Sequence, residues 1–90
     1  MQIKQKPSFK KIYKKLYKNQ LKDVNNAIRR VVETPEIGVE KSGDLSSIFV
    51  YKFNCINQQF LLAYQFNTIT LELLLIGVHE NFYQKLKIGK

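Results

Sequence analysis

Hydrophobic residues recur at two different periods along this chain, and the change of period separates a helical part from a sheet-forming part. Between residues 8 and 34 they follow helical spacing in two runs. The first run is Phe9, Ile12, Tyr13, Leu16 and Tyr17, and the second is Leu21, Val24, Ala27, Ile28, Val31 and Val32. Such spacing gives a helix one apolar stripe. We predict a helical hairpin that starts with Ser8 as N-cap, is divided at Asn19, and is ended by Pro35.

From Ile48 onward, apolar residues alternate at period two, which is the pattern of β-strands. Three such runs are separated by polar turns at residues 54–57 and 67–68, and they predict an antiparallel meander. In the last run, every second residue from Ile69 to Leu75 is apolar. We expect that face of the last strand to carry the helices.

These elements predict an α+β fold, with an N-terminal helical hairpin packed on one face of an antiparallel β-sheet and a short C-terminal helix. Residues 1–90 are enough for one domain with a modest core. The segment before Pro7 is a candidate edge strand, and residues 36–47 are predicted to form a loop. No apolar run reaches the roughly 18 residues that a membrane span needs, and the N-terminus lacks a signal-peptide pattern, so we expect a cytoplasmic protein without a membrane partner.

Charge is the strongest feature of the composition, because 15 Lys and Arg residues against seven Asp and Glu give +8. This excess predicts an anionic partner such as nucleic acid, a ribonucleoprotein or an acidic protein. Candidate RNA or phosphate ligands are Lys10 and Lys14 on the first helix and Arg29 and Arg30 on the second. A lysine face that only contacts solvent, without a bound partner, explains Lys10 and Lys14 equally well. Cys55 and one histidine make no credible zinc set, so we predict no metal and no cofactor.

The segment 77–83 holds the only histidine and follows directly on the last strand. In a helix over residues 79–88, His79 and Tyr83 would lie one turn apart on the same side, with Glu80 beside them. Imidazole changes its charge near neutral pH, which suits it to acid–base chemistry. The structural alternative is that His79 caps or packs, while Phe82 and Leu86 anchor the last helix on the sheet.

Four stretches of the chain resemble the RelE/ParE superfamily of bacterial type II toxins. They are Gly43–Leu45 (GDL), Val50–Phe53 (VYKF), Leu61–Tyr64 (LLAY) and Ile76–Lys87 (IGVHENFYQKLK). The resemblance implies a toxin held by a cognate antitoxin, with one of two activities. Many members are endoribonucleases that cleave messenger RNA on the ribosome, whereas ParE members inhibit DNA gyrase without being nucleases.

The resemblance to YafQ-like members implies that His79 and the neighbouring Phe82 act in RNA cleavage. We therefore predict an endoribonuclease without metal, in which His79, Tyr83 and Lys52 are catalytic, Lys41 binds phosphate, and Phe82 and Glu80 orient the substrate.

The sequence departs from YafQ-like members at residues 54–59, which lack their second histidine and aspartate, and it lacks the strand arginines of RelE-like members. This departure favours the alternative, a ParE-like gyrase inhibitor in which the segment after Gly77 only docks. A plain RNA- or DNA-binding module is a third and weaker interpretation, because the chain shows no recognisable nucleic-acid-binding signature.

Overall fold

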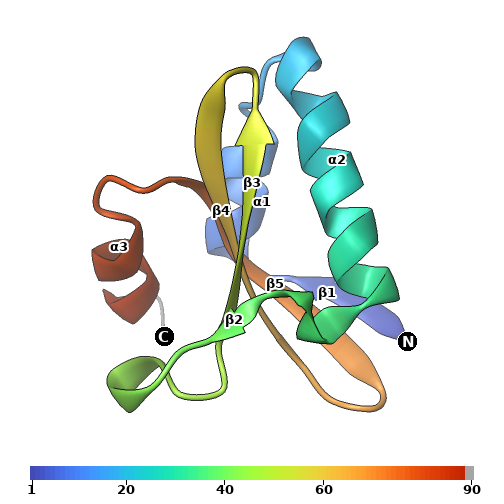
Figure 1. The fold of residues 1–90 in the computed structure, drawn as a ribbon, viewed down its shortest axis with the longest axis vertical. Helices are drawn as coiled ribbons and strands as arrows, with labels where there is room; N and C mark the ends of the chain where they lie inside the picture. Colours follow the sequence, from blue (N-terminus) through green and yellow to red (C-terminus); the bar gives the residue numbers. More distant parts are fainter. Residues whose placement is uncertain (89–90) are drawn as a thin grey trace.

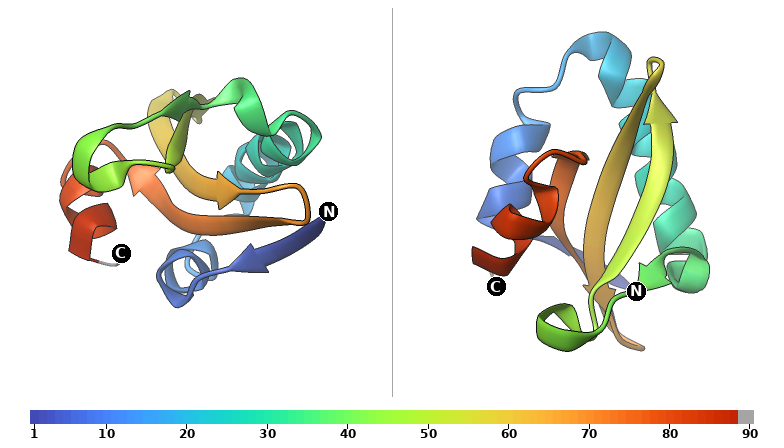
Figure 2. Two further views of the ribbon diagram at one scale, coloured as in Figure 1. Left: turned by 90° about the horizontal axis from the view of Figure 1, so that it is seen from below. Right: turned by 60° about the vertical axis from the view of Figure 1, so that its left-hand side comes forward.

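A five-stranded sheet stands between helices in the computed structural model, which describes residues 1–88, with α2 on one side of the sheet and α3 on the other (Figures 1 and 2). The strands are β1 (Gln2–Gln5), β2 (Val39–Glu40), β3 (Phe49–Cys55), β4 (Gln58–Phe66) and β5 (Thr70–Val78). The helices are α1 (Pro7–Tyr13), α2 (Lys18–Glu33) and α3 (Phe82–Ile88), with short 3-10 turns at Pro35–Ile37 and Gly43–Leu45. The predicted α+β class and the order of its main elements are confirmed.

The sheet has the strand order β1-β5-β4-β3-β2, and its centre is the predicted antiparallel meander of β3, β4 and β5. The sheet as a whole is mixed, which corrects the expectation of an antiparallel one. β1 is an edge strand, as expected, but it runs parallel to β5, with Ile3 opposite Leu71. Two of the helices, α1 and α2, and three other strands lie between β1 and β5 in the chain, and such a long connection permits parallel pairing. β2 lies inside the predicted loop and pairs with β3.

The helix ends differ from the predicted ones. α1 stops at Tyr13, and α2 is preceded by Tyr17 rather than Asn19. The backbone N–H of Tyr17 donates to Oε1 of Gln20 at 2.8 Å, so a side chain of the first turn caps this end. α3 begins at Phe82, which leaves His79 in the turn before it. Within residues 1–88, no helix is long and apolar enough to cross a membrane.

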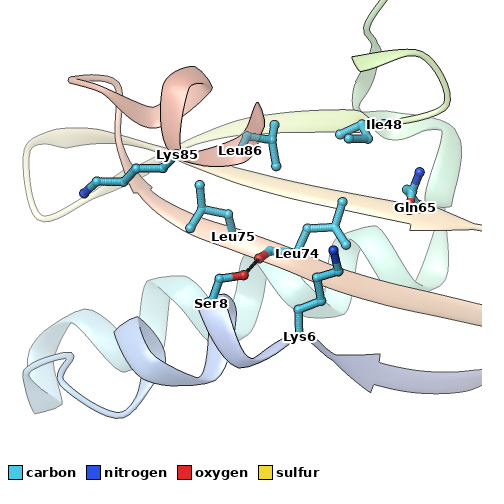
Figure 3. Close-up of a pocket in the computed structure, with 8 residues that line it drawn as sticks. All are labelled: Lys6, Ser8, Ile48, Gln65, Leu74, Leu75, Lys85 and Leu86. Atoms are coloured by element: carbon cyan, nitrogen blue, oxygen red, sulfur yellow. Dashed lines mark hydrogen bonds between the residues drawn. The ribbon is translucent and has the colours of Figure 1, made fainter. Parts of the chain in front are cut away.

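An irregularity in β5 changes which side chains face the helical hairpin. Ala63 pairs with Leu75 while the next residue, Tyr64, pairs with Leu73, so Leu74 is an extra residue on β5. Because side chains alternate at period two, one extra residue moves those that follow to the opposite face. The expectation that Leu75 faces the hairpin was therefore wrong. Ser8, predicted to cap α1, instead donates from Oγ to the carbonyl of Leu74 at 2.7 Å (Figure 3).

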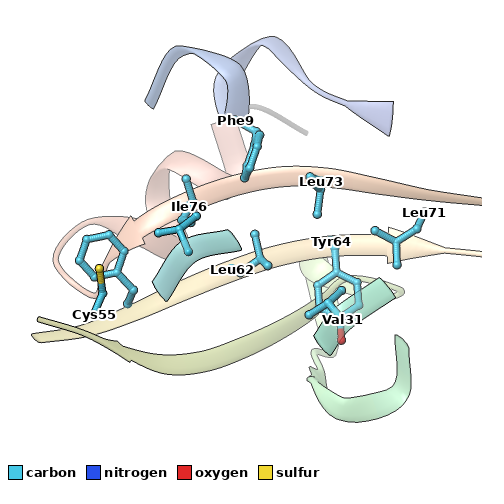
Figure 4. Packing of buried hydrophobic residues seen from close by; sticks show 10 residues of the cluster. Phe9, Val31, Cys55, Leu62, Tyr64, Leu71, Leu73 and Ile76 are labelled. Atoms are coloured by element: carbon cyan, nitrogen blue, oxygen red, sulfur yellow. The ribbon is translucent and has the colours of Figure 1, made fainter. Parts of the chain in front are cut away.

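Two hydrophobic clusters, one on each face of the sheet, result from this arrangement. The first cluster lies under α1 and α2 and contains Phe9, Val24, Val31, Cys55, Phe60, Leu62, Tyr64, Leu71, Leu73 and Ile76 (Figure 4). The second lies under α3 and contains Leu45, Ile48, Val50, Leu61, Ala63, Leu74, Leu75, Phe82 and Leu86. The predicted hairpin on one face is thus confirmed, and the last helix covers the other. Burial of both faces explains why β4 reads as a nearly continuous apolar run.

Tyr64 connects the first cluster to the segment that leads into β2. Its ring is 0% exposed, and its hydroxyl donates to the carbonyl of Pro35 at 2.6 Å and accepts from the N–H of Gly38 at 2.9 Å. A Cβ on Gly38 would lie 2.5 Å from that hydroxyl, so only glycine allows this approach. Burial raises the pKa of Tyr64 above its ordinary value, so the hydroxyl stays protonated and able to donate.

Replacing Tyr64 by phenylalanine is expected to lower the free energy of unfolding by about 1–3 kcal/mol, because two partly buried backbone groups lose their partner. Urea denaturation measures the change. The matched control is Tyr13→Phe, which removes a hydroxyl that donates to Asn25 at an exposed position, and we expect a change within about 0.5 kcal/mol. Equal losses in the two variants would contradict this account of Tyr64.

Candidate functional site

Three of the predicted site residues meet beside the end of β5. The rings of His79 and Tyr83 contact edge to face, with centroids 5.7 Å apart and planes at 73°. Nζ of Lys41 lies 5.3 Å from the centroid of the Tyr83 ring, which is within the range of a cation–π interaction. Tyr83 therefore stands between an imidazole and an ammonium group that are 38 residues apart in the sequence. We call Lys41, His79 and Tyr83 the β5-end cluster.

Each member of the cluster is held by a different element. Tyr83 lies in the first turn of α3, which is docked by Phe82 and Leu86, 2% and 4% exposed. His79 lies in the turn before α3, where its carbonyl accepts from the N–H of Phe82 at 3.1 Å. Lys41 follows β2, and its N–H donates to the carbonyl of Ile48 at 2.8 Å. The predicted anchoring of the last helix by Phe82 and Leu86 is confirmed.

The sheet next to this cluster is open at Gly77, and an exposed cation lies two strands away. Lys52 on β3 pairs with Leu61 on β4, and Leu61 pairs with Gly77 on β5. These three residues form one row across the sheet, and a Cβ on Gly77 would meet no atom within 4 Å. Two strand spacings separate Lys52 from Gly77, which is about 10 Å between their Cα atoms. Lys52 is exposed, whereas Leu61 between them is buried under α3.

The two remaining predicted residues of this region have different surroundings. Glu80 is exposed and lines a hollow with Ile12, Gly77 and Lys85. Phe82 is buried, and its ring centroid lies 5.5 Å from that of Tyr83. Phe82 therefore supports the position of Tyr83 and is itself covered.

The four predicted phosphate ligands of the helices are not brought to the β5-end cluster. Lys10 and Lys14 are exposed on and directly after α1, and Arg29 and Arg30 are exposed on α2. Both helices pack on the first hydrophobic cluster, and Ile12 of α1 also reaches the second, on which α3 packs. Nη1 of Arg29 donates to Oδ1 of Asn26 at 3.1 Å. The basic residues of the chain thus fall into separate groups.

One feature that the sequence reasoning missed is a polar hollow between α2 and β3. Arg30 and Asn26 line one side of it, and Tyr51 and Phe53 line the other. The two aromatic rings are stacked, with centroids 6.0 Å apart and planes at 15°. Tyr51 and Phe53 are two residues apart in a predicted strand, and this spacing places both rings on one face. The sequence could therefore have revealed the aromatic pair.

Cys55 is buried rather than part of a polar turn. Its side chain is 1% exposed, and Sγ donates to the carbonyl of Gln20 at 3.7 Å. Burial raises the pKa of the Cys55 thiol, and the nearby carboxylate of Asp23 raises it further. A thiol that stays protonated and covered is a poor nucleophile. Within residues 1–88, no three His, Cys, Asp or Glu side chains gather as a metal-binding group.

Solved structures with a similar fold include two toxins. The RelBE toxin–antitoxin complex of E. coli superposes with a TM-score of 0.68 at 16% identity, covering 86% of this chain and 94% of that one. A YoeB/ParE toxin from Agrobacterium tumefaciens gives 0.68 at 17% identity, covering 88% and 99%. A conserved hypothetical protein from Helicobacter pylori gives 0.52 at 20% identity, covering 89% and 96%. A search of curated protein sequences finds no match. These likenesses define the fold as that of a small bacterial toxin.

The family follows from the sequence itself. The model of the ParE-like toxins of type II bacterial toxin–antitoxin systems matches residues 3–87. This chain therefore belongs to that family, and the resemblance to the RelE/ParE superfamily is confirmed. A toxin of such a system has an antitoxin as its partner.

Proposed function

We propose that this toxin stops translation by cleaving messenger RNA on the ribosome, as an endoribonuclease that needs no metal ion. The observation that carries the proposal is the β5-end cluster, in which an imidazole, a phenol and an ammonium group lie together near the open position at Gly77. This combination provides a proton carrier and positive charge at one place. RNA cleavage by its own 2′-hydroxyl requires both.

Each of these residues has its own part in RNA cleavage. The 2′-oxygen attacks the adjacent phosphorus, the bond from phosphorus to the 5′-oxygen breaks, and the products are a 2′,3′-cyclic phosphate and a 5′-hydroxyl. His79 carries one proton, either from the 2′-hydroxyl or to the leaving 5′-oxygen, because its exposed ring is accessible to substrate, and solvent water exchanges the other proton. Lys41 and Lys52 approach the scissile phosphate from two sides and stabilise its developing charge. Tyr83 holds the orientation of both His79 and Lys41 through its ring.

A substrate with a single 2′-deoxy nucleotide tests this chemistry. The cleavage site is first mapped on a translated messenger, and a messenger with 2′-deoxyribose at the nucleotide 5′ to the cut is then supplied to ribosomes. We expect no cleavage there, and we expect the normal upstream product to end in a cyclic or 3′-phosphate. Cleavage of the deoxy substrate, or an upstream product ending in a 3′-hydroxyl, would contradict the proposed mechanism.

Lys41 gives a second test, because its ammonium group contacts the Tyr83 ring. Replacing it by glutamine is expected to lower the cleavage rate about 10²-fold, the order that the loss of one preorganised donor costs. Lys41→Arg keeps the charge and should lose less. The control Lys87→Gln removes a charge from the exposed side of α3 and should change the rate little. A rate for Lys41→Gln that equals that of the control would remove Lys41 from the chemistry.

The competing function is inhibition of DNA gyrase without nuclease activity. One observation favours it: His79 is the only histidine of the chain, so no second imidazole can share the acid and base roles. In that case the β5-end cluster would be part of a docking surface. Substitution of His79 would then weaken gyrase inhibition only as far as it disturbs that surface.

A further inference from the structure

The net charge of this protein is confined to the beginning of the chain. Residues 1–22 hold eight lysines and no acidic residue, and the first acidic residue is Asp23. The remaining 68 residues hold seven Lys and Arg and all seven Asp and Glu, so their formal charges cancel. All residues of the β5-end cluster belong to this formally neutral part. The long-range attraction for an anion therefore comes from another surface.

Four of the eight lysines form one exposed surface on α1 and the turn after it. We call Lys10, Lys11, Lys14 and Lys15 the α1 lysine stripe; all four are exposed, and together with Pro7 they line a shallow hollow. The N–H of Lys14 donates to the carbonyl of Lys10 at 3.0 Å, so these two lysines stand one helical turn apart. The apolar residues of the helix point the other way, into the clusters.

The composition of the stripe fits a phosphate backbone better than a protein partner. A protein interface needs apolar or aromatic anchors at its centre, and lysine is depleted there. The stripe offers no aromatic anchor of this kind, because Phe9 and Tyr13 stack on each other on the inner side of the helix; its charged groups are all ammonium groups. Lysines that contact phosphate groups give binding that does not depend on sequence and that weakens with salt.

The position of α1 connects this surface to the proposed cleavage site. Ile12, on the inner side of α1, lines the same hollow as Gly77 and Glu80 at the end of β5. An RNA that lies on the outer side of α1 is therefore separated from that hollow by little more than one helix diameter, about 10 Å.

We propose that the α1 lysine stripe is a second binding surface, which holds the phosphate backbone of RNA while the β5-end cluster acts on the chain that passes beside it. The assignment to RNA rests on the proposed nuclease function. On this account the stripe governs affinity and its salt dependence, and the β5-end cluster governs the rate of the chemical step.

Salt-dependent binding separates these roles. A fluorescent base-paired RNA hairpin is titrated with protein at several NaCl concentrations, and the logarithm of the association constant is plotted against that of the salt concentration. All proteins carry His79→Ala, which keeps the RNA intact. Lys10→Gln/Lys11→Gln is compared with Lys85→Gln/Lys87→Gln, since each pair removes two exposed charges from the last turn of a short helix.

The stripe variant is expected to flatten the slope by about 1.4–1.8, because each phosphate contact contributes about 0.7–0.9. The α3 variant should change the slope by less than half of that. Equal changes in the two variants would show that only net charge matters and would overturn the proposal, as would an unchanged slope in the stripe variant. The proposed nuclease function is tested separately, because messenger that stays intact with the unaltered toxin would end that function without affecting the slope comparison.

Discussion

Replacing His79 by alanine is expected to lower the rate of messenger cleavage about 10²- to 10⁴-fold, the usual contribution of one acid or base group. The fold should be unaffected, because the imidazole is exposed and its ring contact is with Tyr83 at the surface. We expect the free energy of unfolding to change by less than about 0.5 kcal/mol. Single-turnover cleavage on stalled ribosomes measures the rate, and urea denaturation of the same preparations measures the stability.

Tyr83→Phe is the control for this experiment. It keeps the ring that contacts His79 and Lys41 and removes only the hydroxyl. If Tyr83 acts by orienting its neighbours, the variant loses much less activity than His79→Ala. A loss as large as that of His79→Ala would instead give the hydroxyl a direct part in proton transfer. An unchanged rate in His79→Ala would remove the imidazole from the reaction.

Replacing Phe82 by alanine is expected to destabilise the protein by about 3–5 kcal/mol and to abolish most of the cleavage activity. Phe82 is buried between α3 and the sheet, in the cluster that includes Leu75 and Leu86. Its loss leaves a cavity under a helix of one and a half to two turns that has few other anchors. When α3 loosens, Tyr83 no longer holds its place between Lys41 and His79. Activity therefore falls although Phe82 is not exposed to substrate.

Phe82→Leu is the matched variant, because it fills most of the cavity with an apolar side chain. It should recover most of the stability and of the activity together. Thermal unfolding and hydrogen exchange of the α3 amides measure the docking of the helix, and the cleavage assay measures the consequence. If Phe82→Ala unfolds α3 but cleaves at the normal rate, the position of Tyr83 is irrelevant to the reaction.

The local pattern of the sequence predicted most elements of the fold but not the relations between distant ones. Helical spacing found α1 and α2, and alternation found β3, β4 and β5. The parallel pairing of β1 depends on a contact between residues nearly 70 positions apart, which no local period records. The extra residue at Leu74 is equally invisible, because four successive apolar residues from Leu73 to Ile76 fit either face of a buried strand.

The candidate site was predictable in one part only. His79 and Tyr83 are four residues apart, so any compact turn or helix brings them near each other, and they do meet although α3 starts later than expected. The approach of Lys41 depends on β2, which lies in a segment that reads as a loop. The separation of Lys10 and Lys14 from His79 follows from the packing of α1 and α3 on different clusters, which charge alone does not reveal.

The most direct test of the proposed function is one comparison made on a single pair of preparations. The purified toxin and its His79→Ala variant are added to a translating ribosome reaction, messenger 5′-ends are mapped by primer extension, and gyrase supercoiling is assayed in parallel. We predict new ribosome-dependent 5′-ends with the unaltered toxin, their loss with the variant, and normal supercoiling with both. Intact messenger together with loss of supercoiling would contradict the nuclease function and would make the protein a gyrase inhibitor.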